Sequence, residues 1–258
     1  MISGRFVLKR FPLFPRPKGG EIKKPGGRAL DGFRTFWNGL EWSALTDMVF
    51  SVLPALICIT LHELAHGYVA YRLGDGTAKN AGRLTLNPIR HIDWFGLLMM
   101  VSLRFGWAKP VPVDMRNFKN PRLGMAITAA AGPLCNLVLS AIFLFCYGLA
   151  YSRLSTAGSA LAYAALNSLA TAAYLSLSLA VFNLLPISPL DGSKVVFSFL
   201  SDNAYARLMR YERYGMLLLL VLVWTGILGR PLSAVTGWLY ERLFPLAEWA
   251  FTLTAGAR

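Results

Sequence analysis

The chain of 258 residues is rich in apolar side chains and poor in charge. Hydrophobic residues make up 55% of it and charged residues 15%, whereas soluble domains average about 45–50% and about 25%. Such a chain has too much apolar surface to be disordered, and its three cysteines are too few for a disulfide-rich scaffold. The composition argues against an ordinary soluble domain, and we expect an all-α polytopic membrane protein.

The largest single share of the net charge of +13 lies near the N-terminus. Residues 1–34 contain nine lysine and arginine residues against two acidic ones, with several prolines and glycines between them. This pattern predicts a basic, irregular tail over residues 1–40, followed by a membrane-embedded domain over residues 41–258. A basic surface tail suits anionic lipid headgroups better than nucleic acid, so we expect membrane lipids and no nucleic acid among the partners.

Long apolar segments follow the tail, and about 20 such residues suffice to cross the hydrocarbon core of a bilayer. The candidates for spanning helices are residues 48–73, 123–152, 154–190 and 214–229. A short apolar run at residues 94–103 is predicted to be re-entrant or part of a bent helix. Residues 232–254, which contain three charged side chains, are predicted to be interfacial or only partly inserted. With these partly buried pieces, we expect about four to six membrane helices.

A stretch of different character, residues 74–122, separates the first and second core helices. It is punctuated by glycine, proline and asparagine, which is typical of loops and short strands. Prolines occupy alternate positions within residues 109–113, which indicates an edge strand because proline cannot donate to a β-ladder. We therefore predict a short β-strand or re-entrant element here.

Three ionisable residues in the second half of the first span form an HExxH pattern: His62, Glu63 and His66. On a helix, the two histidines lie one turn apart on the same face and can share one metal ion. Imidazole nitrogens, one oxygen ligand and an open fourth position are typical of catalytic zinc, and Glu63 can then act as the base toward a water molecule. Ionisable groups at membrane depth are costly and usually mark function, so the pattern predicts one zinc ion there.

A third protein ligand is needed to complete such a site, and the residues alone leave it open among His91, Asp191 and Glu248. Asp191 ends the uncharged run of residues 154–190, after two prolines and just before Gly192. A turn at this point can direct a carboxylate inward at membrane depth. The competing role for Asp191 is to cap the N-terminus of the following helix.

Further motifs accompany the HExxH helix. They are an NxxPxxxxDG pattern from Asn183 to Gly192, the string Gly-Pro-Leu-Cys-Asn at residues 132–136, and three strings at residues 82–93, 106–113 and 117–122. Together they resemble the site-2 protease family of intramembrane zinc metalloproteases. The last three strings are similar to the compact, bacterial-type branch that lacks a PDZ domain.

This resemblance implies a function and a set of site residues. It implies that His62, His66 and Asp191 bind one zinc ion and that Glu63 is the catalytic base. The expected activity is hydrolysis of peptide bonds within or next to the transmembrane segments of protein substrates, by a metalloprotease domain that occupies residues 41–258.

Two asparagines are weaker candidates. The resemblance suggests that Asn136 faces the catalytic centre, where its amide can hold a substrate backbone or stabilise an oxyanion. Its alternative role is a hydrogen bond between helices. Asn183 can likewise contact substrate, or it can cap the broken helix.

Charge in the loops predicts an orientation. Residues 74–93, 109–122 and 207–213 are each net basic, and the positive-inside rule places basic loops in the cytoplasm. We therefore expect a multi-pass protein of a bacterial plasma membrane with its active site nearer the cytoplasmic side, although the basic tail opposes this orientation if residues 48–73 make the first crossing. A membrane metal-binding transporter and a non-catalytic membrane scaffold stay open as alternative functions.

Overall fold

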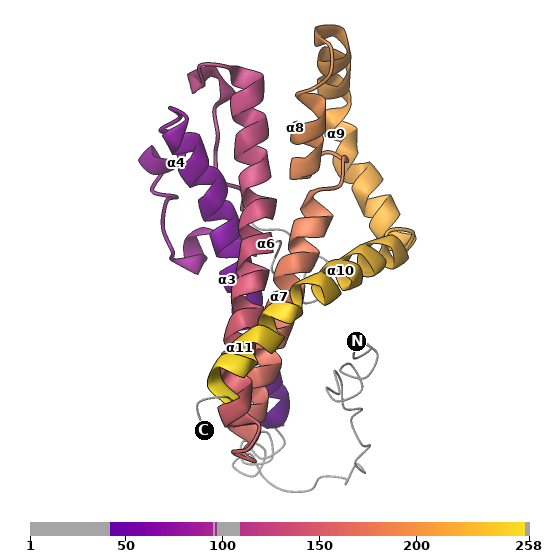
Figure 1. Ribbon diagram of the computed structural model, residues 1–258. Helices are drawn as coiled ribbons and strands as arrows, with labels where there is room; N and C mark the ends of the chain where they lie inside the picture. The colour runs from indigo at the N-terminus through magenta and orange to yellow at the C-terminus, as the bar shows by residue number, and fades with distance from the viewer. Residues whose placement is uncertain (1–41, 95, 97–108, 256–258) are drawn as a thin grey trace, which may run out of the picture. The chain divides into compact units, whose positions relative to one another are not determined.

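The computed structural model describes residues 42–94, 96 and 109–255, which form helices joined by short connections (Figure 1). The elements are α3 (Trp42–Arg72), α4 (Thr77–Asn80), η1 (Pro88–Arg90), η2 (Met115–Asn117), α6 (Pro121–Leu154), α7 (Ala160–Asn183), α8 (Asp191–Phe197), α9 (Asp202–Trp224), α10 (Gly229–Leu243) and α11 (Pro245–Ala255). No β-strand occurs within this described part of the chain, which confirms the predicted all-α class. The predicted tail, residues 1–40, and most of the predicted re-entrant run lie outside it.

Three described helices are long and apolar enough to cross a membrane: residues 52–72 of α3, α6 and α7. Residues 214–224 of α9 pass the same test together with residues 229–255, and this pair is bent by 84°. Counted as one span, the pair brings the number of spans in the described residues to four, the lower end of the predicted range. The protein is therefore an integral, polytopic membrane protein.

The uncharged run of residues 154–190 is divided into more than one element. α7 begins at Ala160 because the Ser159 hydroxyl accepts a hydrogen bond from the Ala162 N–H at 3.2 Å, which is typical helix capping. α7 ends at Asn183, and the two prolines that follow cannot donate in a helix. A non-helical connection, residues 184–190, then leads into α8.

The predicted edge strand at residues 109–113 stays a prediction. These residues have no regular secondary structure, and the hydrogen bond from the Lys109 N–H to the His91 carbonyl at 3.0 Å joins them to another stretch of backbone. Residues 97–108, which precede them, lie outside the described part of the chain.

α6 and α7 pack against each other (Figure 1), and serine side chains form hydrogen bonds between the two helices. The Ser140 hydroxyl donates to the Ala173 carbonyl at 2.8 Å, and the Ser176 hydroxyl donates to the Asn136 carbonyl at 2.9 Å. Both serines are fully buried. Small residues and hydroxyl hydrogen bonds are what membrane helices use to approach each other.

The C-terminal helices pack against the same bundle. α11 packs along α6, and a side chain at Gly148 would meet the Ala247 carbonyl oxygen at 2.1 Å. Tyr240 of α10 joins Leu144 and Leu177 in a buried cluster. The absence of a side chain at Gly148 therefore allows the close crossing of α6 and α11.

A buried carboxylate, Asp75, ties the turn after α3 to the chain ahead of α6. It accepts hydrogen bonds from the Thr77 N–H at 3.0 Å, the Asp114 N–H at 2.8 Å and the Asn117 side-chain amide at 2.8 Å. Asp75 is fully buried. The bonds hold residues 109–114, called below the 109–114 segment, against the end of α3.

Replacing Asp75 with asparagine is expected to destabilise the protein by about 1–3 kcal/mol, because an amide N–H would then face backbone N–H groups. Burial raises the pKa of Asp75, but the hydrogen bonds from Thr77, Asn117 and the Asp114 N–H outweigh it and lower the pKa below its ordinary value. The contribution of Asp75 is therefore complete above that ordinary value and is lost as the pH falls below it. Thermal unfolding in detergent between pH 7 and pH 3 should show a smaller acid-induced loss in the variant; identical profiles would contradict this role.

Candidate metal centre

α3 brings two imidazoles to one place. His62 and His66 lie on the same face, one turn apart, with their Nε2 atoms 3.1 Å from each other. Their ring planes are nearly perpendicular, at 88°. Both side chains are buried, with 5% and 9% of their residue surfaces exposed. The HExxH spacing thus produces the convergence that helix geometry predicts.

Asp191 completes the group from a position 129 residues further along the chain. Its Oδ2 atom lies 3.2 Å from the Nε2 atoms of both His62 and His66. The capping position of α8 is Leu190, with no side-chain cap, so Asp191 does not cap the helix. Gly192 allows this placement, because a side chain there would meet the Leu184 carbonyl oxygen at 2.2 Å.

α6 packs against the two histidines at Gly132, a residue without a side chain. A Cβ atom added at Gly132 would lie 2.3 Å from His66 Nε2 and 2.7 Å from His62 Cε1. The space that holds the donor atoms therefore depends on glycine at position 132. The sequence pattern showed Gly132 only as part of a motif and gave no reason for it.

Each imidazole uses its other nitrogen to contact α6. His66 Nδ1 lies 2.7 Å from the Thr128 carbonyl oxygen, and because a carbonyl only accepts, Nδ1 carries the proton and Nε2 presents a lone pair. His62 Nδ1 lies 3.0 Å from the side-chain amide of Asn136. Asn136 Oδ1 is buried without a partner among the described residues; turning the amide by half a rotation pairs this oxygen with His62 Nδ1–H and leaves the His62 Nε2 lone pair free.

The donor set fits a zinc ion. In this tautomeric state three lone-pair atoms lie 3.1–3.2 Å apart and cannot hydrogen-bond to one another, so a cation bound between them would stabilise all three. Tetrahedral ligands about 2.0–2.1 Å from zinc are roughly 3.3 Å from each other. His62, His66 and Asp191 are also the one group of three or more potential ligands found within the described residues.

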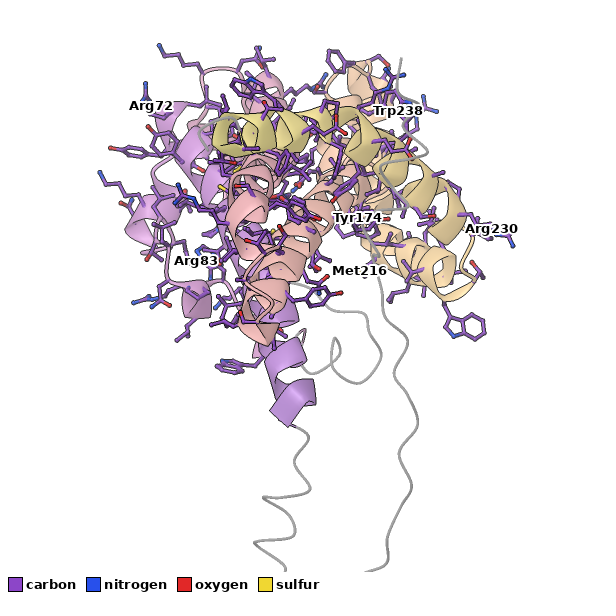
Figure 2. All side chains as sticks on the ribbon, turned by 60° about the horizontal axis from the view of Figure 1, so that its bottom comes forward. Arg72, Arg83, Tyr174, Met216, Arg230 and Trp238 are labelled. Atoms are coloured by element: carbon purple, nitrogen blue, oxygen red, sulfur yellow. The ribbon has the colours of Figure 1, made fainter. Side chains whose placement is uncertain are left out.

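Glu63 lies beside this group and is held by the backbone. Its Oε2 atom accepts a hydrogen bond from the Val111 N–H at 2.9 Å. The 109–114 segment is itself fixed by Arg83, labelled in Figure 2, which donates to the Lys109 carbonyl at 2.6 Å, and by Asp75. The carboxylate is therefore anchored through one oxygen, and the contact with Val111 is one that sequence reasoning did not predict.

A cavity of about 530 Å³ opens next to these side chains. His62, Glu63, His66 and Asp191 line it, and most of its other walls are aliphatic. Met216 of α9, labelled in Figure 2, is one of these apolar wall residues. A polar centre thus opens into an apolar space large enough for a short stretch of peptide.

The remaining candidates from the sequence lie in different surroundings. Asn183 lines the cavity and donates its amide to the Leu179 carbonyl at 2.9 Å. Asn136 is fully buried behind His62. His91 lies in the cavity wall and does not belong to the three-residue group, while Glu248 is exposed on α11.

Lys194 is a further polar residue that the sequence analysis did not single out. Its Nζ atom lies 4.0 Å from Asp191 Oδ1, and the side chain lines the cavity. The signal was its position three residues after Asp191, which puts both residues on one face of a helix.

The fold and the site together define a class, that of polytopic membrane metalloproteases. The sequence profile of Peptidase family M50 matches residues 149–225. A protein of Bacillus subtilis named "Putative zinc metalloprotease YwhC" is 39% identical over 194 residues, which cover 75% of this chain and 86% of that protein. Proteins of Mycolicibacterium smegmatis and Mycobacterium tuberculosis, both named Rip2 with the same description, are each 28% identical over 190 residues, covering 72% of this chain and 71% of theirs.

The chain therefore belongs to peptidase family M50, the site-2 protease family. It is a zinc metalloprotease, and proteases of this family act on protein substrates in membranes. No solved structure matches the chain.

Replacing Asn136 with alanine is expected to weaken zinc binding about 10–100-fold, because His62 then loses the partner that fixes its tautomer. Asn136→Asp keeps an oxygen acceptor for His62 Nδ1–H and should bind zinc nearly as well as the wild type. Competition with a chelator of known affinity measures both. Equal zinc affinities of the alanine and aspartate variants would contradict this role.

Proposed function

We propose that this chain is an intramembrane zinc metalloprotease that hydrolyses peptide bonds within or next to the transmembrane segments of membrane proteins. One observation carries the proposal: two imidazole nitrogens and a carboxylate oxygen converge within 3.2 Å of one another inside a bundle of membrane helices. A second carboxylate, Glu63, lines the same cavity.

In this proposal His62, His66 and Asp191, which line the cavity, would hold one zinc ion. When bound, zinc supplies Lewis acidity to the scissile carbonyl group and makes water a stronger acid. Thr128 and Asn136 keep the two imidazoles in the tautomer that presents Nε2. The short distances between the donor atoms and the space at Gly132 support this assignment.

Glu63 serves as the general base. Its Oε2 atom stays bonded to the Val111 N–H, so Oε1 is the atom that takes a proton from the attacking water. The same oxygen then delivers the proton to the nitrogen of the leaving amine, which completes hydrolysis. The fixed anchor at Val111 keeps the carboxylate from turning away between the two transfers.

The substrate reaches this centre as an extended chain. A peptide bond within a helix is covered by the neighbouring turns, so the helix must unwind before the carbonyl can meet the site. The aliphatic walls suit the apolar side chains of a transmembrane segment, and Asn183 offers its amide to the freed backbone. Asn136 acts through His62, because it lies behind that ring.

The protein functions in a bacterial plasma membrane, among its lipids, with the centre nearer the cytoplasm. The relatives are bacterial. The loops around α4 and before α6, which carry basic residues, lie at the same end of the bundle as α8 (Figure 1), and the positive-inside rule places such loops in the cytoplasm.

Purified protein in detergent or liposomes, mixed with a single-pass test substrate, examines the proposal directly. We expect cleavage inside or beside the apolar segment, loss of cleavage with a zinc chelator, and recovery when zinc is returned. Cleavage that continues after the metal has been removed, or no cleavage by zinc-loaded protein, would contradict it.

A further inference from the structure

His91 is a buried side chain of the cavity wall that the mechanism above does not use. It follows the short η1 helix, and only 1% of its surface is exposed. His91 is one of the residues that line the cavity, together with His62 and Glu63. Because the other wall residues are largely aliphatic, the polar ring of His91 needs hydrogen-bond partners.

One ring nitrogen of His91 has a partner within the protein, and the other has none among the described residues. Nε2 lies 2.9 Å from the Thr85 carbonyl oxygen, which can only accept, so Nε2 carries the proton. Nδ1 then presents a lone pair, and it is buried without a hydrogen-bond partner in the described part of the chain. Buried acceptors are nearly always satisfied in folded proteins, so the unfilled position indicates a missing donor.

The backbone of His91 is joined to the segment that anchors the base. The His91 carbonyl accepts from the Lys109 N–H at 3.0 Å, and Val111, two residues further on, donates to Glu63. His91 and Glu63 therefore flank the same short stretch of backbone. A group bound to His91 Nδ1 would be held at a fixed position relative to the base.

We propose that His91 is a substrate-positioning residue whose Nδ1 atom accepts a hydrogen bond from a backbone N–H of the extended substrate. This inference rests on the proposed function. A transmembrane segment brings mostly apolar side chains to the cavity, so the donors that it offers are the backbone N–H groups freed when its helix unwinds. Away from bulk water these groups need acceptors, and His91 supplies one.

Two variants of His91 separate its two hydrogen bonds. His91→Gln keeps an N–H near the position of Nε2, for Thr85, and loses the acceptor at Nδ1. His91→Asn keeps an acceptor near Nδ1 and loses the bond to Thr85. We expect kcat/KM for a single-pass peptide to fall about tenfold in His91→Gln, as for one lost hydrogen bond, and less than about threefold in His91→Asn. The reverse order would assign His91 a purely structural role and overturn the proposal.

A substrate series tests the partner itself. Peptides in which one backbone amide at a time, near the cleaved bond, is replaced by an ester lack a single N–H donor. At one position the ester should lower kcat/KM about tenfold with the wild-type protein and cause no further loss with His91→Gln. Equal effects on both proteins at every position would overturn the proposal.

A third measurement does not depend on either His91 variant. The chain has three histidines, so ¹⁵N-histidine NMR of Glu63→Gln protein shows His91 as the ring unaffected by zinc removal. Adding the uncleaved peptide should shift its Nδ1 signal in the direction of hydrogen bonding, and an unchanged signal would overturn the proposal. Failure of the wild-type protein to cleave any peptide would instead count against the proposed function, and the NMR titration would still decide the role of His91.

Discussion

Replacing Glu63 with glutamine should lower the rate of peptide-bond cleavage by about 10²–10⁴-fold while the protein keeps its zinc. Positioned acids and bases typically contribute this much, and glutamine cannot take a proton at neutral pH. Its amide oxygen can still accept from the Val111 N–H, which now donates to Glu63 at 2.9 Å. The variant therefore removes the base and preserves the anchor.

The matched control is Glu248→Gln, which makes the same chemical change on the exposed face of α11 and should cleave like the wild type. Cleavage rates and bound zinc are measured for all three proteins in the same detergent. Wild-type cleavage by Glu63→Gln would contradict the assigned base. It would also direct attention to the transporter and scaffold alternatives, because neither needs a carboxylate between the histidines.

Replacing Gly132 with alanine should remove zinc binding and with it nearly all activity. The added Cβ atom would lie 2.3 Å from His66 Nε2 and 2.7 Å from His62 Cε1, inside contact distance of both imidazoles. Both rings are also tied to α6 through Thr128 and Asn136, so they cannot both move away without losing these bonds. One methyl group thus disturbs two metal ligands.

Gly237→Ala provides the control, because a Cβ atom at Gly237 of α10 meets nothing within 4 Å. Zinc content per chain and the thermal unfolding midpoint should match the wild type in this variant. Gly132→Ala should fold and lack zinc. Full zinc occupancy in Gly132→Ala would show that the imidazoles do not converge where the structure has them.

The part of the site that is formed by residues close together in the sequence could be predicted. His62, Glu63 and His66 are placed by the period of one helix, and the structure brings the two imidazoles together as that period requires. The long uncharged runs likewise predicted α6 and α7, because crossing hydrocarbon demands apolar residues whatever the tertiary contacts are.

Contacts between distant segments could not be predicted in this way. The residues alone left the third member of the group open among Asp191, His91 and Glu248. The turn after the uncharged run drew attention to Asp191, and the resemblance to a family strengthened the assignment of this residue. Its position depends on the path of residues 184–190 and on the close packing of Gly192 against Leu184. No periodic pattern contains that information.

The hydrogen bond that anchors Glu63 could not be predicted from the sequence either. Glu63 is held by a backbone N–H of Val111, 48 residues away, and any residue except proline offers that donor. The edge-strand pattern drew attention to residues 109–113 for another reason, the alternating prolines. A hydrogen bond between a side chain and a backbone N–H constrains the residue type only at the side-chain position. The sequence therefore does not reveal which backbone group is the partner.

X-ray absorption at the zinc edge, on purified wild-type and Asp191→Ala proteins, is the most direct measurement of the metal centre. We expect one zinc ion per wild-type chain, surrounded by nitrogen and oxygen atoms with two imidazoles among them, and a zinc content greatly reduced in Asp191→Ala. A sulfur ligand in the wild type, or the same zinc content and spectrum in both proteins, would contradict the assignment of His62, His66 and Asp191.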